Sequence, residues 1–403
     1  MLNRLISLGL ILGLVVGLGA SMTENEILHR ISKASSPLGE IFINAVKMVV
    51  IPLVVSVIFT SVARLGDPKK LGNISTITFI FYCGTLFPAI AIGMGVMFLG
   101  LRFIPDIVMP ENELNQIPEL QSTMDFVVNL IPSNPFSAAA NGQILPLIVF
   151  TALLAAAVGT LPSDNRSRMI SGVEDFSQAL IKLVWWILYL APIGIFGLVA
   201  SSTALLGWSL IQSLLVFIIC VLLGLLLLLV FVFLPLLIIY VKMNTAKFFR
   251  DTLSPASIAF STTSTAAAIP VSLEQSINKL NVSKSIADLL IPLGASIYRP
   301  GSALFQGAAI IFLAHIYDVP LVFSSVGGII FATFLVSLTV APVPSSGVVT
   351  MTPALATIGV PITGLGLILG IDRIPDMMRS CINVLGQIAA AIVVDHHIKS
   401  KDP

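Results

Sequence analysis

The feature that most constrains this chain is a series of apolar runs, each long enough to cross a lipid bilayer as a helix. The hydrocarbon core of a bilayer is about 30 Å thick, which roughly 20 apolar residues span as an α-helix. Such runs lie approximately at residues 5–20, 41–62, 74–101, 143–161, 181–206 and 208–241. They predict six membrane helices, and the 403 residues leave room for roughly seven to nine crossings.

Composition supports this class and excludes others. Only 10% of the residues are charged and 56% are hydrophobic, whereas a soluble domain is typically about 25% charged. The net charge is +1 and no basic patch is interleaved with aromatic residues, so we expect no nucleic-acid partner. The first apolar run is interpreted as a retained helix. The cysteines lie singly in apolar runs, without metal-like or redox spacing, which predicts a packing role for Cys83, Cys220 and Cys381.

Basic residues in the loops predict an orientation, because Lys and Arg of short loops tend to stay cytoplasmic. The loops that follow 41–62, 143–161 and 208–241 carry Lys or Arg. By contrast, residues 103–142 include several carboxylates and no Lys or Arg. We therefore expect 103–142 to be an extracellular loop. The chain is predicted to be a multi-pass protein of the plasma (inner) membrane, with cytoplasmic N- and C-termini.

Beyond residue 251 the apolar runs are broken by Ser, Thr, Pro and Gly. Unpaired backbone groups are tolerated at membrane depth only where they are buried in protein or line a cavity. Ser261–Pro270 and Ser337–Gly347 are therefore predicted to be the tips of re-entrant hairpins. Each is followed by a segment with a polar interruption, at 298–302 and 372–383, and an odd number of crossings separates the two units. This predicts an inverted repeat, which points to a transport site. The alternative is two ordinary Ser/Thr-rich helices.

The densest polar cluster at membrane depth lies in the last helix. Asp372, Asp376, Arg379 and Asn383 fall on one helical face, with spacings of four, three and four. Charges in a membrane helix are costly and by default mark a site. Arg379 offers a planar fork for a carboxylate, Asp376 an acceptor for an ammonium group, and Asn383 an amide for a second carboxylate. Alternatively, Asp376 and Arg379 simply neutralise each other.

Several motifs carry a resemblance to a known family across nearly the whole chain. They are KMVVIPLVVSVIFTSVARLGDPKKLG, NLIPSNPFSAAANGQILPLIVF, PIGIF, PLGAS, GSALFQG and ILGIDRIPDMMRSCINVLG. In order and spacing, the chain resembles the dicarboxylate/amino acid:cation symporters, the glutamate transporter family. The resemblance implies a secondary active symporter that imports an acidic amino acid (glutamate or aspartate) or a related carboxylate.

The fold that the resemblance implies is an all-α membrane protein with eight transmembrane helices, two re-entrant helical hairpins, inverted repeats and an elevator mechanism. The usual assembly is a homotrimer in the lipid bilayer. The implied division is scaffold helices 1–2 at residues 1–72, transport-domain helix 3 at 73–102, the extracellular loop at 103–142, scaffold helices 4–5 at 143–207, and the remaining transport domain at 208–403.

The resemblance also implies roles for individual residues. Arg379 matches the arginine that holds the substrate's side-chain carboxylate, and Asp376 the aspartate that holds its amino group. Further substrate contacts are implied at Asn383, Ser380, Ser302, Ser264, Thr265, Val343 and Gly347.

Departures from the family pattern concern the coupling ion. Members that use sodium typically have Asn-Met-Asp-Gly-Thr in helix 7 and an aspartate near the end of the helix 8 motif. Here the first three of these helix 7 positions hold Tyr298, Arg299 and Pro300, and the helix 8 aspartate is Gln387. In helix 3, Leu86 replaces a serine. These changes disfavour Na⁺ and leave H⁺ as the candidate coupling ion, and no resident cofactor or metal is expected.

Arg299 stands where the sodium motif has a neutral Met. We hypothesise that its guanidinium substitutes for bound Na⁺ and offsets the charges of Asp372 and Asp376. Because Arg does not deprotonate under ordinary conditions, it cannot itself be the coupled ion. Transport would then be coupled to a proton carried by a carboxylate, or would be sodium-independent exchange. The alternative is that Arg299 points elsewhere and pairs with a carboxylate for packing. Arg373 is also unusual, and we predict that it reaches Thr263 of the first hairpin.

Other function classes fit less well. An intramembrane enzyme would need a nucleophile and a base, yet the four histidines lie in loops or at helix ends, and no HExxH, GxSxG or P-loop run occurs. The alternatives that stay open are a sodium-independent exchanger, a carrier of neutral amino acids or dicarboxylates in which Asp372 holds Arg379 internally, and, more remotely, an anion channel.

Overall fold

The computed structural model describes residues 2–23, 25–65, 68–105, 128, 131–141, 143–321, 323–338, 340, 345–361 and 364–401. Within these ranges the chain forms helices and turns and no strand, which confirms the all-helical prediction. Three segments are long and apolar enough to cross a membrane: Thr76–Phe103, Ala191–Tyr240 and Arg373–Ser400. Shorter apolar helices occur at Leu8–Met22, Ile51–Thr60, Pro146–Gly159 and Val326–Ser337.

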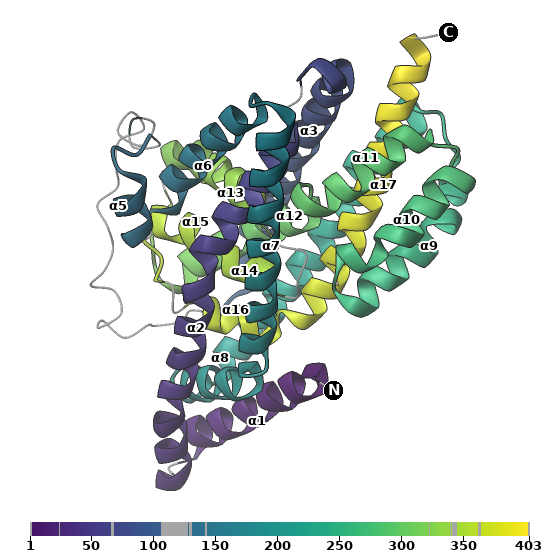
Figure 1. Ribbon diagram of the computed structural model, residues 1–403. Helices are drawn as coiled ribbons and strands as arrows, with labels where there is room; N and C mark the ends of the chain where they lie inside the picture. The colour runs from purple at the N-terminus through teal and green to yellow at the C-terminus, as the bar shows by residue number, and fades with distance from the viewer. Residues whose placement is uncertain are drawn as a thin grey trace.

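The first half of the chain consists of long helices that mostly follow the apolar runs. They are α1 (Leu2–Met22), α2 (Glu26–Leu65), α3 (Pro68–Gly100) with the short η1 (Leu101–Phe103), α5 (Pro135–Ala140), α6 (Ile144–Gly159), α7 (Ser163–Leu188) and α8 (Ala191–Leu228). α1 packs along α8, and α2 packs against α6, α7 and α8 (Figure 1). Of the predicted extracellular loop, residues 106–127, 129–130 and 142 lie outside the described residues.

The prediction of one continuous helix over 181–206 is wrong. α7 ends at Leu188, and α8 begins at Ala191 with Pro192 in its first turn. Proline is well placed there because the first N–H groups of a helix have no partner inside it, whereas in the middle of a helix it would remove a hydrogen bond. The predicted boundary between 206 and 208 is a kink at Gly207, whose φ of 61° and ψ of −145° are accessible mainly to glycine.

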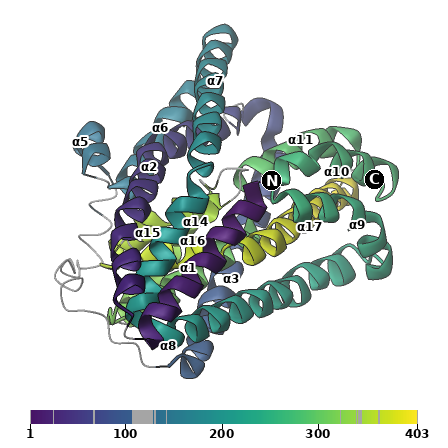
Figure 2. The ribbon, with the colours of Figure 1, turned by 90° about the horizontal axis from the view of Figure 1, so that it is seen from below.

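α8 continues as two wider helical turns, the π-helices η3 (Leu229–Phe233) and η4 (Leu236–Tyr240). Pro235 lies between them and lacks the N–H that a regular helix would need. The part of α8 that follows the kink at Gly207 and these two π-helices form the long rod along the lower edge of Figure 2. The rod ends where α9 (Thr245–Thr262) begins, after the cap residue Asn244.

The second half of the chain contains two reversals, at the two stretches where the apolar pattern is broken. α9 and α10 (Thr265–Asn278) pack side by side (Figure 1). The turn between them is narrower than the predicted tip at 261–270: Thr263 takes a left-handed φ of 52°, and Ser264 caps α10. α13 (Phe323–Ser337) packs against α14 (Ser346–Thr350) and α15 (Thr352–Thr357). Thr339 and residues 341–344 of the second predicted tip lie outside the described residues.

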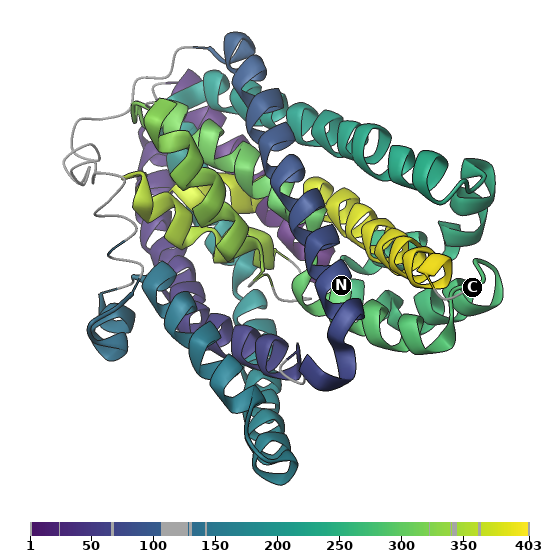
Figure 3. The ribbon, with the colours of Figure 1, turned by 90° about the horizontal axis from the view of Figure 1, so that it is seen from above.

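Each reversal is followed by an interrupted helix. α11 (Lys284–Ile297) stops at Tyr298, which is extended, and α12 starts after Arg299 and covers Pro300–Ile316. α16 (Leu365–Ile371) is followed by a single turn residue, Asp372, before α17 (Arg373–Lys401). In Figure 3, α17 lies between the rod of α8 and the α9–α10 pair.

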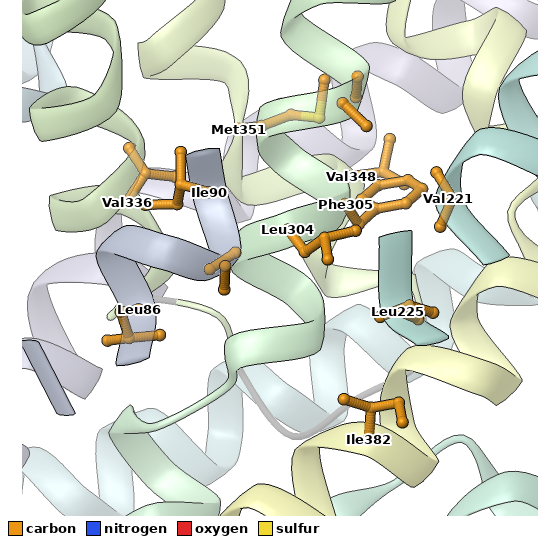
Figure 4. Close-up of a cluster of buried hydrophobic side chains, with 14 of the residues drawn as sticks. Leu86, Ile90, Val221, Leu225, Leu304, Phe305, Val336, Val348, Met351 and Ile382 are labelled. Atoms are coloured by element: carbon orange, nitrogen blue, oxygen red, sulfur yellow. The ribbon is translucent and has the colours of Figure 1, made fainter. Parts of the chain in front are cut away.

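The helix α12 lies at the centre of the fold. Nearly all of its residues are buried, which agrees with an apolar sequence that lacks one preferred face. It packs against α3, α8, α13 and α17. Figure 4 shows its Leu304 and Phe305 among side chains from these helices and from α14, including Ile90, Val221 and Val348.

The outer surface is unlike that of a soluble protein. Large apolar side chains are exposed on several helices, among them Phe79, Phe98, Trp186, Phe231 and Ile239. Large exposed apolar surface marks contact with a partner or a membrane, and here it coincides with helices long enough to span one. The cysteines are free thiols; Cys220 is buried as predicted, and Cys83 and Cys381 are half-buried.

Candidate functional site

The centre of the candidate site is a buried cluster of one guanidinium and two carboxylates. Arg379 lies on α17 and is 1% exposed. Its Nη1 and Nη2 donate to the two oxygens of Asp372, at 2.8 and 3.0 Å. Its Nε lies 2.9 Å, and its Nη2 2.8 Å, from Oδ1 of Asp376. Three of the five guanidinium N–H donors are therefore hydrogen-bonded to protein carboxylates.

The two ion pairs of Arg379 that the sequence analysis gave as alternatives, with Asp376 and with Asp372, are both present. Asp376 and Arg379 are bonded, and Asp372 holds Arg379 internally through both of its oxygens. Because isolated buried charges are strongly disfavoured, each of these three groups depends on the others. Arg299 is buried as well, at 4% exposure, close enough to Asp376 and Arg379 for their charges to act on its guanidinium. Two carboxylates and two guanidinium groups give the set a formal charge of zero.

The guanidinium of Arg379 is also enclosed by uncharged neighbours. Its Cζ lies 4.2 Å from the ring centroid of Phe305, within cation–π range. Gly347 of α14 lies against it, so closely that a Cβ at this position would be 3.3 Å from Cζ. The absence of a side chain at Gly347 thus keeps space next to the guanidinium.

Asn383 joins α17 to the start of α12. Its Oδ1 accepts the backbone N–H groups of Gly301 at 2.8 Å and Ser302 at 3.3 Å, and its Nδ2 donates to Ser302 Oγ at 3.2 Å. These N–H groups belong to the first turn of α12, where a helix has no internal partners for them. Gly301 permits this approach, because a Cβ there would lie 2.7 Å from the carbonyl oxygen of Arg379.

Both hairpins reach α17. Arg373 Nη1 donates to Thr263 Oγ1 at the tip of the first hairpin, at 3.1 Å, which confirms the predicted contact. Asp376 Oδ2 accepts the backbone N–H of Ser345, just before α14, at 3.1 Å. Ser345 has a left-handed φ of 56°. The sites of hairpin contact are thus three residues apart on one helix.

The remaining predicted site residues lie around this cluster. Ser380 is buried on α17. Ser264 caps α10, and the Thr265 hydroxyl faces the carbonyl oxygen of Ala295 at 3.5 Å, near the end of α11. Tyr298 donates to or accepts from Thr85 at 2.7 Å, and its ring stacks on Tyr82 with centroids 4.2 Å apart. Val343 lies outside the described residues.

The comparison with known families decides the class of this protein. The profile of the sodium:dicarboxylate symporter family matches residues 2–397. The chain belongs to the sodium:dicarboxylate symporter family. This confirms the resemblance inferred from the motifs and excludes a chance origin for their order.

Curated relatives of this symporter family member align over most of both chains. The proton/glutamate-aspartate symporter of Escherichia coli K12 is 28% identical over 89% of this chain and 84% of its own. The proton/sodium-glutamate symport protein of Geobacillus stearothermophilus is 29% identical over 96% and 92%. The C4-dicarboxylate transport protein of Bacillus subtilis is 29% identical over 95% and 90%. These relatives differ in the ions and substrates that their names give.

Sequence reasoning missed some neighbours of the cluster in this symporter family member. Gln306 on α12 is fully buried, and its Nε2 donates to the carbonyl oxygen of Gly347 at 3.0 Å and to Thr350 Oγ1 at 3.1 Å. Gln306 is the one amide in the otherwise apolar run of α12, which was an available signal. Phe305 and Ser345 gave no such signal, because an aromatic residue in an apolar helix and a serine in a loop are ordinary.

Proposed function

We propose that this protein is a secondary active transporter that imports an acidic amino acid, such as glutamate or aspartate, or a related carboxylate. The observation that carries the proposal is the planar fork of Arg379, buried beside Asp376 and held between the two hairpins. A guanidinium binds a carboxylate through two parallel hydrogen bonds, and a carboxylate binds an ammonium group. The pair therefore suits a substrate with both charges. The printed functions of the relatives agree with this class.

In the proposed binding step, the substrate carboxylate takes the place of Asp372 on Arg379. Asp372 now accepts two N–H groups, at 2.8 and 3.0 Å, and Asp376 accepts a third, so two guanidinium donors are left for another anion. A proton on Asp372 would weaken its hold and open the fork. Proton and substrate carboxylate would then enter the site together, and Asp376 would accept the substrate's ammonium group in place of one of its present donors.

A second candidate is a carrier of neutral amino acids, and the same internal pair favours it. If Asp372 stays on Arg379, the site offers no fork for a second carboxylate. Competition separates the two. Uptake of labelled glutamate should be inhibited by aspartate and glutamate but not by serine or cystine. Uptake by a neutral carrier should instead be inhibited by serine and cystine but not by aspartate or glutamate.

The proposed arrangement in the cell follows the family resemblance. Residues 1–72 and 143–207 form a static scaffold, and residues 73–102 and 208–403 a mobile carrier with two re-entrant hairpins in an elevator-type fold of eight membrane helices. Burial of the Arg379 cluster within the second part, between α12, α14 and α17, supports placing the site in the carrier. We further propose a homotrimer in the plasma (inner) membrane, with both termini cytoplasmic.

The deciding experiment is uptake into proteoliposomes that contain the purified full chain. We expect glutamate or aspartate uptake driven by an inward proton gradient, abolished by a protonophore, and nearly unchanged when choline replaces sodium. Arg379→Lys should reduce uptake at least about tenfold, because an ammonium group cannot reproduce two parallel bonds. Arg250→Lys, at a side chain that is 76% exposed, is the matched control. Wild-type rates in Arg379→Lys would contradict the proposed site, and steep dependence on a sodium gradient the proposed coupling.

A further inference from the structure

The interruption between α11 and α12 leaves backbone carbonyl groups inside the protein. α11 ends at Ile297, and the extended residues Tyr298 and Arg299 separate it from α12. Both residues are buried, at 0% and 4% exposure. The last carbonyls of a helix mostly have no partner within it, and its end carries partial negative charge. The Gly294 carbonyl does accept one backbone bond, from the Tyr298 N–H at 2.9 Å. Broken helices in transporters use such carbonyls to coordinate a coupling cation.

Here the protein's own side chains donate to these carbonyls. Gln387 of α17 points its Nε2 at the carbonyl oxygens of Gly294 and Tyr298, both at 3.2 Å. Because both partners are acceptors, the atom that faces them must be the amide nitrogen, so the side-chain orientation is fixed. Arg299 Nη2 donates to the carbonyl oxygen of Ala295. Three carbonyls at one helix end thus receive N–H groups.

Packing holds the Gln387 amide in this position. Gln387 is 2% exposed, and a Cβ on Gly294 would lie 2.9 Å from its Cγ and 3.3 Å from the Tyr82 hydroxyl. The Tyr82 hydroxyl is buried and, among the described residues, has no hydrogen-bond partner. The stacked rings of Tyr82 and Tyr298 close the same side. The Gln387 amide is therefore tightly packed beside the end of α11.

We propose that Gln387 is the residue that determines coupling-ion specificity, because its amide takes the place of a monovalent cation at the interruption between α11 and α12. An amide group supplies the positive ends of two N–H dipoles to two carbonyls, as a cation would, but it cannot leave with the substrate. Arg299 satisfies the adjoining carbonyl in the same way. Substrate binding then consumes no cation at this position. The inference rests on the proposed transport function but concerns the ion alone.

The test replaces the amide nitrogen by oxygen. In Gln387→Glu, two carboxylate oxygens would face carbonyl oxygens about 3 Å away, which is repulsive unless a cation lies between them. At alkaline pH we expect the melting temperature of purified Gln387→Glu to rise with sodium chloride and not with choline chloride at equal ionic strength. Its uptake should be at least about tenfold higher in sodium than in choline. Wild type should show neither effect. Gln178→Glu, at an exposed position on α7, controls for the added charge.

Two further variants keep the inference falsifiable if Gln387→Glu folds poorly. Gln387→Met removes both donors without adding charge, and it should melt lower than wild type in every salt. Arg299→Met alone should stay insensitive to sodium, because Gln387 still donates to two of the three carbonyls. A wild-type protein whose melting responds to sodium, a Gln387→Met variant that melts like wild type, or a Gln387→Glu variant indifferent to sodium would each overturn the inference.

Melting requires no substrate, so these results stay interpretable if the proposed substrates are not transported. Failure of glutamate, aspartate and serine uptake by wild type would count against the proposed function alone. Sodium-dependent uptake by wild type, with the substrate specificity confirmed, would count against Gln387 as the cation substitute alone.

Discussion

Replacing Asn383 by alanine should destabilise the junction of α12 and α17 by an amount that follows from its hydrogen bonds. The Gly301 N–H bond, at 2.8 Å, has good length, and the Ser302 bond, at 3.3 Å, is weaker. A buried donor that loses its partner costs about 1–3 kcal/mol. Counting the first bond fully and the second in part gives a loss of about 2–4 kcal/mol. The third bond, from Nδ2 to the Ser302 hydroxyl, is also lost, and we expect its loss to lower the stability by less.

The assay is reversible unfolding in mixed micelles, followed by tryptophan fluorescence. Ser302→Ala removes only the Nδ2 contact and should cost about 1 kcal/mol. Asn165→Ala, at an exposed position on α7, is the matched control and should unfold like wild type. If Asn383→Ala unfolds like Asn165→Ala, the two N–H groups have other partners and the capping argument is wrong. If Ser302→Ala reproduces the whole loss, the amide oxygen is not the stabilising atom.

Two further predictions concern neighbours of Arg379. Arg373→Ala removes the bond to Thr263 at 3.1 Å and should reduce uptake up to about tenfold. Thr263→Val should have a similar effect. A double variant that transports no worse than the weaker of the two single variants would show that the pair acts as a unit. Gly347→Ala places a methyl group 3.3 Å from the Cζ of Arg379, whose guanidinium is held by three hydrogen bonds, and should reduce uptake at least about tenfold. Gly84→Ala, where a Cβ meets nothing within 4 Å, should transport normally.

The sequence predicted the face of α17 and named its charge pairs as alternatives, but not that both pairs form together. Helical periodicity places Asp372, Asp376 and Arg379 on one side, as the structure shows. In a straight helix, however, residues seven apart are about 10 Å apart along the axis. Asp372 has helical backbone angles, φ −60° and ψ −20°, and its carbonyl accepts the Asp376 N–H at 2.8 Å, so it is the long side chain of Arg379 that covers this distance. Periodicity contains no information about how far a side chain extends along the helix.

Apart from the bond between Arg373 and Thr263, contacts between distant segments were also beyond the sequence patterns. Gln306 donates to Gly347, 41 positions along the chain, and only the fold brings them together. The predicted continuous helix over 181–206 was wrong for a local reason. Pro192 favours the start of a new helix, but the sequence is apolar on both sides of the break. By contrast, the reversals after residue 251 were predictable, since Ser, Thr and Pro interrupt apolar runs that are too short to cross a bilayer.

The position of the charges on α17 ties the site to both hairpins. Arg373 contacts the tip of the first hairpin, and Asp376 contacts the residue that precedes α14 in the second. Asp376 is also a partner of Arg379, so a ligand that draws Asp376 or Arg379 toward itself must alter the Ser345 contact. Because helix α17 carries all three side chains on neighbouring turns, the proposed binding of a substrate carboxylate to Arg379 would act through Asp376 on the segment that begins at Ser345. The first hairpin is held one turn away, through a bond that does not involve the fork.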